Sequence, residues 1–434
     1  FMGDTRGRGT KRIQDAILLR ARQFREDAGP LAHPVRPESF VEINNFYTVT
    51  VYEKGAEVIG MLRRLVGDRG YAKALDLYFD RHDGQAATVE DWLRAFEDAT
   101  GRDLSQFKRW YSQAGTPRVT VEEDWQDGRY TLTLSQRTPP TPGQPDKAPF
   151  VIPVAVGLLN PNGDEVAPTR VLELTEARQS FHWDGLATRP VPSILRGFSA
   201  PVILDRQAPE GEAAFLLAHD SDEFNRWEAG QALARRAIRA ALDGGAPDPA
   251  WAPSLAAALR DDALSPGYRA LLLSLPSQEE TAAAVWDAGR AVDPGAIHAA
   301  HEAVRDHLAQ ALRDLLPAFH DAAQAAGPYS PDADSVGRRA LGNAALAFLV
   351  RSEGPARAER QFGAADNMTQ SVAALAALLT VGRGEAELAA FHDRWKGERL
   401  VLDKWFALQA SLARPEAAVA TAERLTRHPA FDWK

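Results

Sequence analysis

Two tyrosines could do chemistry in the segment "NNFYTVTVYEKGAEV", residues 44–58. Tyr47 and Tyr52 stand at the start of a predicted helix, because Val58, Met61 and Leu65 follow at the three- and four-residue spacings of an apolar helical face. A tyrosine hydroxyl stays neutral up to a pKa of about 10, so it can donate a hydrogen bond to an oxyanion without adding a full charge. The simpler interpretation, from the residues alone, is that both rings pack against neighbouring helices.

The ten histidines are the residues to search for a metal site, because a chain without Cys must use His and carboxylate ligands. None of them begins a His-Glu-x-x-His motif. The nearest pattern is "IHAAHEAVRDH", in which His298, His301 and Glu302 share a predicted helical face. A zinc site there is one hypothesis, and an exposed polar stripe is the simpler one. We expect His33 and His82 to brace turns, so we predict no metal ligand in this chain.

Other catalytic motifs are missing from the sequence. It contains no Gly-x-Ser-x-Gly nucleophile elbow and no phosphate-binding Gly-Lys-Ser/Thr loop, which argues against the usual serine hydrolases and nucleotide-binding enzymes. Asn367 begins "NMT", which fits a glycosylation acceptor, but a helix-capping asparagine is the favoured interpretation.

Composition narrows the class of partner. The 434 residues carry a net charge of -9, which argues against a nucleic-acid or anionic-membrane surface. No run of about eighteen uncharged apolar residues occurs, so the sequence holds no transmembrane candidate. Peptides or small molecules are the expected partners. The absence of Cys and of export features favours a cytoplasmic protein.

The apolar pattern divides the chain into three regions, 1–117, 118–206 and 207–434. The first has helical spacing, with a predicted helix cap at Thr88. The second alternates with a period of two about Asp127-Gly128 and Asn162-Gly163, which predicts two hairpins separated by a proline-rich loop, 137–149. Further strands near 178–185 and 199–206 complete a small antiparallel β-sandwich. The third region is rich in Ala and Leu and predicts an irregular, superhelical α-helical array.

The string "NNFYTVTVYEKGAEVIGML" closely resembles the segment that follows the zinc site in the bacterial aminopeptidase N family, which are zinc-dependent alanyl aminopeptidases of the gluzincin class. Further strings occur in the order that the family has them: "QFREDAGPLAHPVRP", "LYFDRHDGQAAT", "DLSQFKRWYSQAGTP", "DNMTQSVAALAAL" and "DKWFALQA". The resemblance spans essentially the whole chain and is most specific over the first 117 residues.

This resemblance implies a fold and a reaction. The fold would be multidomain α+β, with the helical back half of a thermolysin-like catalytic domain at 1–117, a β-sandwich at 118–206 and most of a helical domain at 207–434. The reaction would be zinc-assisted removal of the amino-terminal residue from peptides. In that reaction Tyr52 would donate a hydrogen bond to the tetrahedral oxyanion, and Tyr47 would line the pocket for the first side chain.

The sequence departs from the family in one important respect. The family's His-Glu-x-x-His motif, its third glutamate ligand and its Gly-x-Met-Glu-Asn motif are absent. We therefore expect a fragment that lacks the amino-terminal part and the extreme carboxyl end, with the ligands of the single zinc ion outside this chain and no turnover by the chain alone. The alternative is a non-catalytic protein whose helical array binds peptides or serves as a scaffold.

Overall fold

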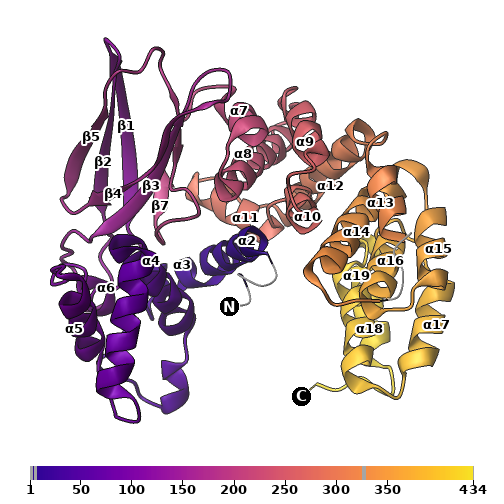
Figure 1. The fold of residues 1–434 in the computed structure, drawn as a ribbon. Coiled ribbons are helices and arrows are strands. Elements are labelled where there is room, and N and C mark those ends of the chain that lie inside the picture. Colours follow the sequence, from indigo (N-terminus) through magenta and orange to yellow (C-terminus); the bar gives the residue numbers. More distant parts are fainter. Residues whose placement is uncertain (1–2, 4–6, 325–328, 434) are drawn as a thin grey trace. The chain divides into compact units, whose positions relative to one another are not determined.

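The computed structural model describes residues 3, 7–324 and 329–433. These residues form two compact units, Arg8–Ala229 and Gly230–Lys434, drawn in Figure 1. Among the described residues, no helix combines the length and the apolar composition needed to cross a membrane.

Helices and short turns make up the first part of the Arg8–Ala229 unit. Helix α2 is amphipathic and buries Ile13 and Ala16. A π-helical turn, η1, joins it to helix α3. The elements of this part are α2 (Arg8–Leu18), η1 (Leu19–Gln23), α3 (Phe24–Ala28), the 3-10 turn η2 (Ile43–Phe46), a second π turn η3 (Thr50–Lys54), α4 (Gly55–His82), α5 (Val89–Thr100) and α6 (Arg109–Ser112).

The predicted cap at Thr88 is confirmed as a capping box at the start of α5. The Thr88 hydroxyl accepts from the backbone N–H of Asp91, and the Asp91 carboxylate accepts from the backbone N–H of Thr88. Two otherwise unpaired amide groups at the helix end are thereby satisfied.

Two small sheets form the β-sandwich (Figure 1). One sheet has the strand order β5-β2-β1-β7 and the other has the order β4-β3-β6. Both predicted hairpins are present, and Asp127 and Gly128 adopt the positive φ angles of 47° and 81° that a tight turn needs. The strands are β1 (Arg118–Gln126), β2 (Arg129–Arg137), β3 (Ile152–Leu159), β4 (Glu165–Leu174), β5 (Arg178–Trp183), β6 (Val191–Ile194) and β7 (Ile203–Asp205).

The sandwich differs from the prediction in two strands. Strand β7 pairs with β1 in parallel, so the sheets are not antiparallel throughout. Strand β6 was not predicted, and it contains Pro192, a residue type that argues against a central strand. The structure accommodates that proline because β6 is the last strand of its sheet.

The helices ahead of the sandwich pack directly on it. The ring of Trp110 stacks on that of Phe150 with 4.1 Å between centroids, and its indole N–H donates to the carbonyl of Val151 at 2.8 Å. Both predicted boundaries, 117/118 and 206/207, therefore lie inside one compact unit rather than between units. The division into three domains stays a prediction.

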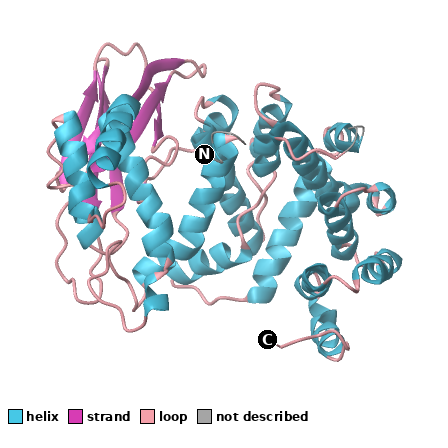
Figure 2. Cartoon of the chain, turned by 60° about the horizontal axis from the view of Figure 1, so that its bottom comes forward, coloured by secondary structure: helices cyan, strands magenta, loops and turns pink. Residues whose placement is uncertain are grey.

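The described residues after the sandwich form helices joined by loops and turns, as predicted (Figure 2). Asn367 is the N-cap of α16, and its side chain accepts from the backbone N–H of Gln370, which confirms the capping interpretation. The helices are α7 (Glu212–His219), α8 (Glu223–Leu242), α9 (Trp251–Arg260), α10 (Pro266–Leu272), α11 (Gln278–Asp287), α12 (Pro294–Ala311), α13 (Leu316–Gln324), α14 (Ala333–Glu353), α15 (Ala356–Ala364), α16 (Met368–Thr380), α17 (Glu385–Trp395), α18 (Arg399–Ser411) and α19 (Ala418–Thr426).

Candidate functional site

The structure brings the two predicted site residues together. The rings of Tyr47 and Tyr52 stack with 6.3 Å between centroids and 22° between planes. Each residue is 58% exposed, and among the described residues neither phenol hydroxyl has a hydrogen-bond partner. Phe46 meets Tyr47 edge-on at 5.8 Å and extends this aromatic surface. Two phenol groups are therefore free to meet a ligand.

Tyr52 lies within the π turn η3, just before the regular helix α4 begins at Gly55. Single π turns are uncommon and occur frequently at functional sites. A second π turn, η1, packs against η3, and the side-chain amide of Gln23 from η1 donates to the hydroxyl of Thr50 at 3.2 Å. The backbone N–H of Thr50 donates to the Glu26 carboxylate at 3.2 Å. These contacts fix the beginning of the turn that carries Tyr52.

A buried ion pair fixes the end of the same turn. The Lys54 ammonium donates to the Asp27 carboxylate at 2.7 Å, and both side chains are only 1% exposed. The same ammonium donates to the carbonyl of Gly115 at 2.9 Å, and the Thr116 hydroxyl donates to Asp27 at 2.8 Å. A buried charge needs such partners, because an unpaired one would lose its hydration without compensation. The network thus ties η3 to α3 and to the segment just before β1.

Gly115 has a conformation that suits this role. Its φ angle is 95°, and a Cβ atom there would come within 3.0 Å of the Thr138 side chain. Glycine alone adopts that backbone angle readily and leaves the space free. Its carbonyl can consequently approach the buried Lys54 ammonium.

The tyrosines were predicted from the sequence, whereas Lys54 and Asp27 were missed. A signal for Lys54 was present, because it precedes Val58, Met61 and Leu65 by four, seven and eleven residues on the buried face of α4. A charged residue on an apolar stripe indicates a buried ion pair. No comparable pattern marks Asp27 as its partner.

Neither interpretation of the His298, His301 and Glu302 pattern, a zinc site or an exposed polar stripe, holds at His301. This residue is fully buried, its Nε2 lies 2.9 Å from the Thr281 hydroxyl, and among the described residues its Nδ1 has no hydrogen-bond partner. Burial, with the nearby Arg305 guanidinium, lowers the pKa of His301 to about 4. The adjacent Glu302 forms ion pairs with Arg305 and Arg351. The interpretation of an exposed polar stripe is therefore wrong for His301, which is a neutral core residue.

The remaining candidates are structural. The Nδ1 atom of His33 lies 2.7 Å from the carbonyl oxygen of the next residue, Pro34. His82 is the last residue of α4, and its ring lies 5.4 Å from that of Tyr78. In the described part of the chain, no group of three or more His, Cys, Asp or Glu side chains could hold a metal ion.

Comparison with known proteins assigns this chain to a family. Residues 3–111 match the "Peptidase family M1 domain", residues 115–207 match a "Domain of unknown function (DUF3458) Ig-like fold", and residues 210–434 match a "Domain of unknown function (DUF3458_C) ARM repeats". Aminopeptidase N of Caulobacter vibrioides is 48% identical over 442 residues, which cover 99% of this chain and 50% of that protein. The chain belongs to the aminopeptidase N family.

Another member of this family and a solved structure also match nearly the whole chain. Aminopeptidase N of Escherichia coli is 40% identical over 453 residues, covering 99% of this chain and 51% of that protein. The crystal structure of Legionella pneumophila aminopeptidase A in complex with aspartic acid superimposes with a TM-score of 0.81 and 25% identity, over 95% of this chain and 51% of that one. The chain thus spans about half the length of the relatives it matches. The α+β architecture, with an Ig-like β domain and an ARM-like helical array, is confirmed.

The buried ion pair between Asp27 and Lys54 predicts that the two substitutions that remove it will not be additive in their effect on stability. Lys54→Met leaves Asp27 buried without its cation, so we expect it to lower the free energy of unfolding by about 3–5 kcal/mol. Lys54→Met combined with Asp27→Leu should cost clearly less than the two single changes together, because no unpaired charge remains. Urea denaturation, with hydrogen exchange at the amides of Arg8–Ala229, measures these differences. If the changes in the free energy of unfolding simply added in the double variant, the result would contradict the assigned ion pair.

The buried imidazole predicts a pH dependence with a definite sign. The unfolded chain protonates His301 near its ordinary pKa of 6.5, whereas the folded chain does so only near pH 4. The unfolded state binds more protons between these values, so stability is lost as the pH falls from 6.5 to about 4. His301→Gln should remove this component of the slope, and His298→Gln should keep it. Identical slopes for His301→Gln and the unaltered chain would show that the assignment is wrong.

Proposed function

We propose that this chain is part of a zinc-dependent aminopeptidase that removes the amino-terminal residue from peptides. Its substrates would be peptides with a free amino terminus. The observation that carries the proposal is the Tyr52 hydroxyl, which is exposed, unpartnered among the described residues, and held on a turn that is anchored at both ends. Membership of the aminopeptidase N family supports the reaction class.

Tyr52 would stabilise the charge that develops when the first peptide carbonyl is attacked. A phenol O–H is a neutral donor, and a donor aimed at an oxygen that gains charge favours the transition state over the ground state. Such a donor works best when its position is fixed beforehand, because no reorganisation is then needed during the reaction. The buried contacts of Thr50 and Lys54 support this role, since they fix the turn on either side of Tyr52.

Tyr47 would line the pocket for the side chain of the first residue. Its ring stacks on Tyr52 on one face and contacts Phe46 edge-on, so it presents an apolar surface next to the proposed oxyanion donor. A substrate side chain packed there would lie beside the bond to be cleaved. Its ring, rather than its hydroxyl, would make this contact.

The zinc ion that the family resemblance implies would supply Lewis-acid chemistry in the complete enzyme. The described residues do not fit such a site, because they contain no cluster of three ligating side chains. We assign no step to the metal and propose that its ligands lie outside these 434 residues. On this proposal the chain alone binds no catalytic zinc and turns over no peptide. A cytoplasmic location stays a prediction.

Substitution of Tyr52 tests the proposed role directly. In the complete enzyme, Tyr52→Phe should lower kcat for an alanyl amide by about two orders of magnitude, the scale for loss of one oxyanion donor. Tyr47→Phe is the matched control, because it removes the neighbouring hydroxyl but keeps the ring, and kcat should change little. An unchanged kcat in Tyr52→Phe, or equal losses in both variants, would refute the assignment.

A further inference from the structure

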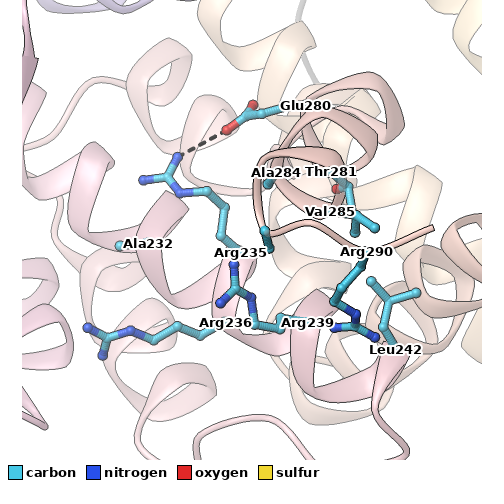
Figure 3. Close-up of a pocket in the computed structure, with 11 residues that line it drawn as sticks. Ala232, Arg235, Arg236, Arg239, Leu242, Glu280, Thr281, Ala284, Val285 and Arg290 are labelled. Atoms are coloured by element: carbon cyan, nitrogen blue, oxygen red, sulfur yellow. Dashed lines mark hydrogen bonds and ion pairs between the residues drawn. The ribbon is translucent and has the colours of Figure 1, made fainter. Parts of the chain in front are cut away.

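A pocket of about 370 Å³ lies within the Gly230–Lys434 unit, between α8 and α11 (Figure 3). Its walls are largely hydrocarbon, contributed by Ala232, Leu242, Ala284, Val285 and Ala288. Small-molecule sites have volumes of roughly 300–1,000 Å³ and are lined mainly by apolar groups with a few polar ones. This pocket has the size and the lining of such a site.

Four of the six polar residues that line the pocket are arginines, and the others are Glu280 and Thr281. Arg235, Arg236, Arg239 and Arg290 line it, against a single carboxylate, Glu280. Arg235 pairs with Glu280 at 3.3 Å, and Arg290 pairs with Asp243 just outside the lining at 2.8 Å. Within the described part of the chain, Arg236 and Arg239 have no ion-pair partner, and both are exposed. The pocket therefore keeps an uncompensated positive charge.

The side chains of Arg236 and Arg239 point in different directions. Figure 3 shows the side chain of Arg236 extending back along α8, away from Arg290 and from α11. The guanidinium of Arg239 lies on the α8 side of the hollow instead. Arg235 and Arg239 are four residues apart on one helix, where like charges repel. An anion between them would turn that repulsion into attraction, so Arg239 is the cation best placed for a ligand.

The chemistry of these groups selects the kind of anion. A guanidinium presents parallel N–H groups that match the two oxygens of a carboxylate. The apolar walls favour a ligand with a hydrocarbon body. Glu280 at the rim disfavours a polyanion, because a second negative charge would approach its carboxylate.

We propose that this pocket binds a small monocarboxylate with an apolar body. Its carboxylate pairs with Arg239, and its hydrocarbon part packs against Leu242 and Val285. Two sources share this chemistry, a free carboxylic acid and the carboxyl end of a short peptide with an apolar last residue. The inference rests on the pocket alone and does not depend on the role proposed for Tyr52.

Calorimetric titration of the 434-residue chain tests the proposal. The probes are octanoate, which represents a free acid, and N-acetyl-leucyl-leucine, which represents a peptide end whose blocked amine cannot be processed. We expect at least one acid to bind. Its neutral amide should bind at least about tenfold more weakly, because the charge-assisted pair is lost. Whichever acid binds more tightly identifies the source.

Substitutions at two exposed arginines of α8 provide a test variant and its matched control. Arg239→Gln should weaken binding about tenfold, whereas Arg236→Gln, with the same loss of charge on the same helix, should change it less than about twofold. Ala284→Trp, which fills the hollow, should abolish binding, and circular dichroism confirms that each variant is folded.

Several results would overturn the proposal. These are the absence of binding by either acid at millimolar concentration, equal binding of acid and amide, and equal effects of the two arginine substitutions. Displacement of octanoate by inorganic phosphate at equal concentration would also overturn it, because the apolar walls would then contribute nothing. None of these results bears on catalysis by Tyr52, so the two proposals fail separately.

Discussion

The buried ion pair between Asp27 and Lys54 is the interaction on which the candidate site depends. It joins three segments that are distant in the sequence: helix α3, the π turn η3 and the residues just before the first strand. Removing two charges from water is unfavourable, and only good geometry with additional hydrogen bonds compensates for it. In this protein Gly115 and Thr116 supply those additional bonds. The position of Tyr52 follows from this network.

Other polar contacts extend the same principle through the Arg8–Ala229 unit. Arg12 forms a two-point ion pair with Glu57 at 2.5 Å, and also donates to the carbonyls of Gly197 and Phe198. Helix α2, helix α4 and the end of the sandwich are thereby connected by one guanidinium. Directional contacts of this kind specify a geometry more narrowly than apolar packing does. Together with the packing of Trp110 on Phe150, they join the helices to the sandwich within one compact unit.

Local sequence signals predicted much of the fold. Asp127-Gly128 specified its hairpin because few residues adopt two successive positive φ angles, and Thr88 specified a helix start through its own side chain. The parallel pairing of β7 and the short strand β6 depend on contacts with distant strands, which no local pattern records. His301 was misjudged for the same reason, because its burial comes from helix packing around it. The sequence named Tyr47 and Tyr52 as candidates, and their roles stay predictions. It did not mark Asp27, because the contact of Asp27 depends on a partner 27 residues away.

A double-mutant cycle on kcat in the complete enzyme tests most directly whether the buried pair acts through Tyr52. Lys54→Met, Tyr52→Phe and the double variant would be compared with the unaltered enzyme on one alanyl amide, each under conditions in which it is folded. If Lys54 serves to position the phenol, the double variant will be no slower than Tyr52→Phe, because the group being positioned is already gone. If the two losses multiply, Lys54 and Tyr52 act independently, and the buried pair does not hold the phenol in its working position.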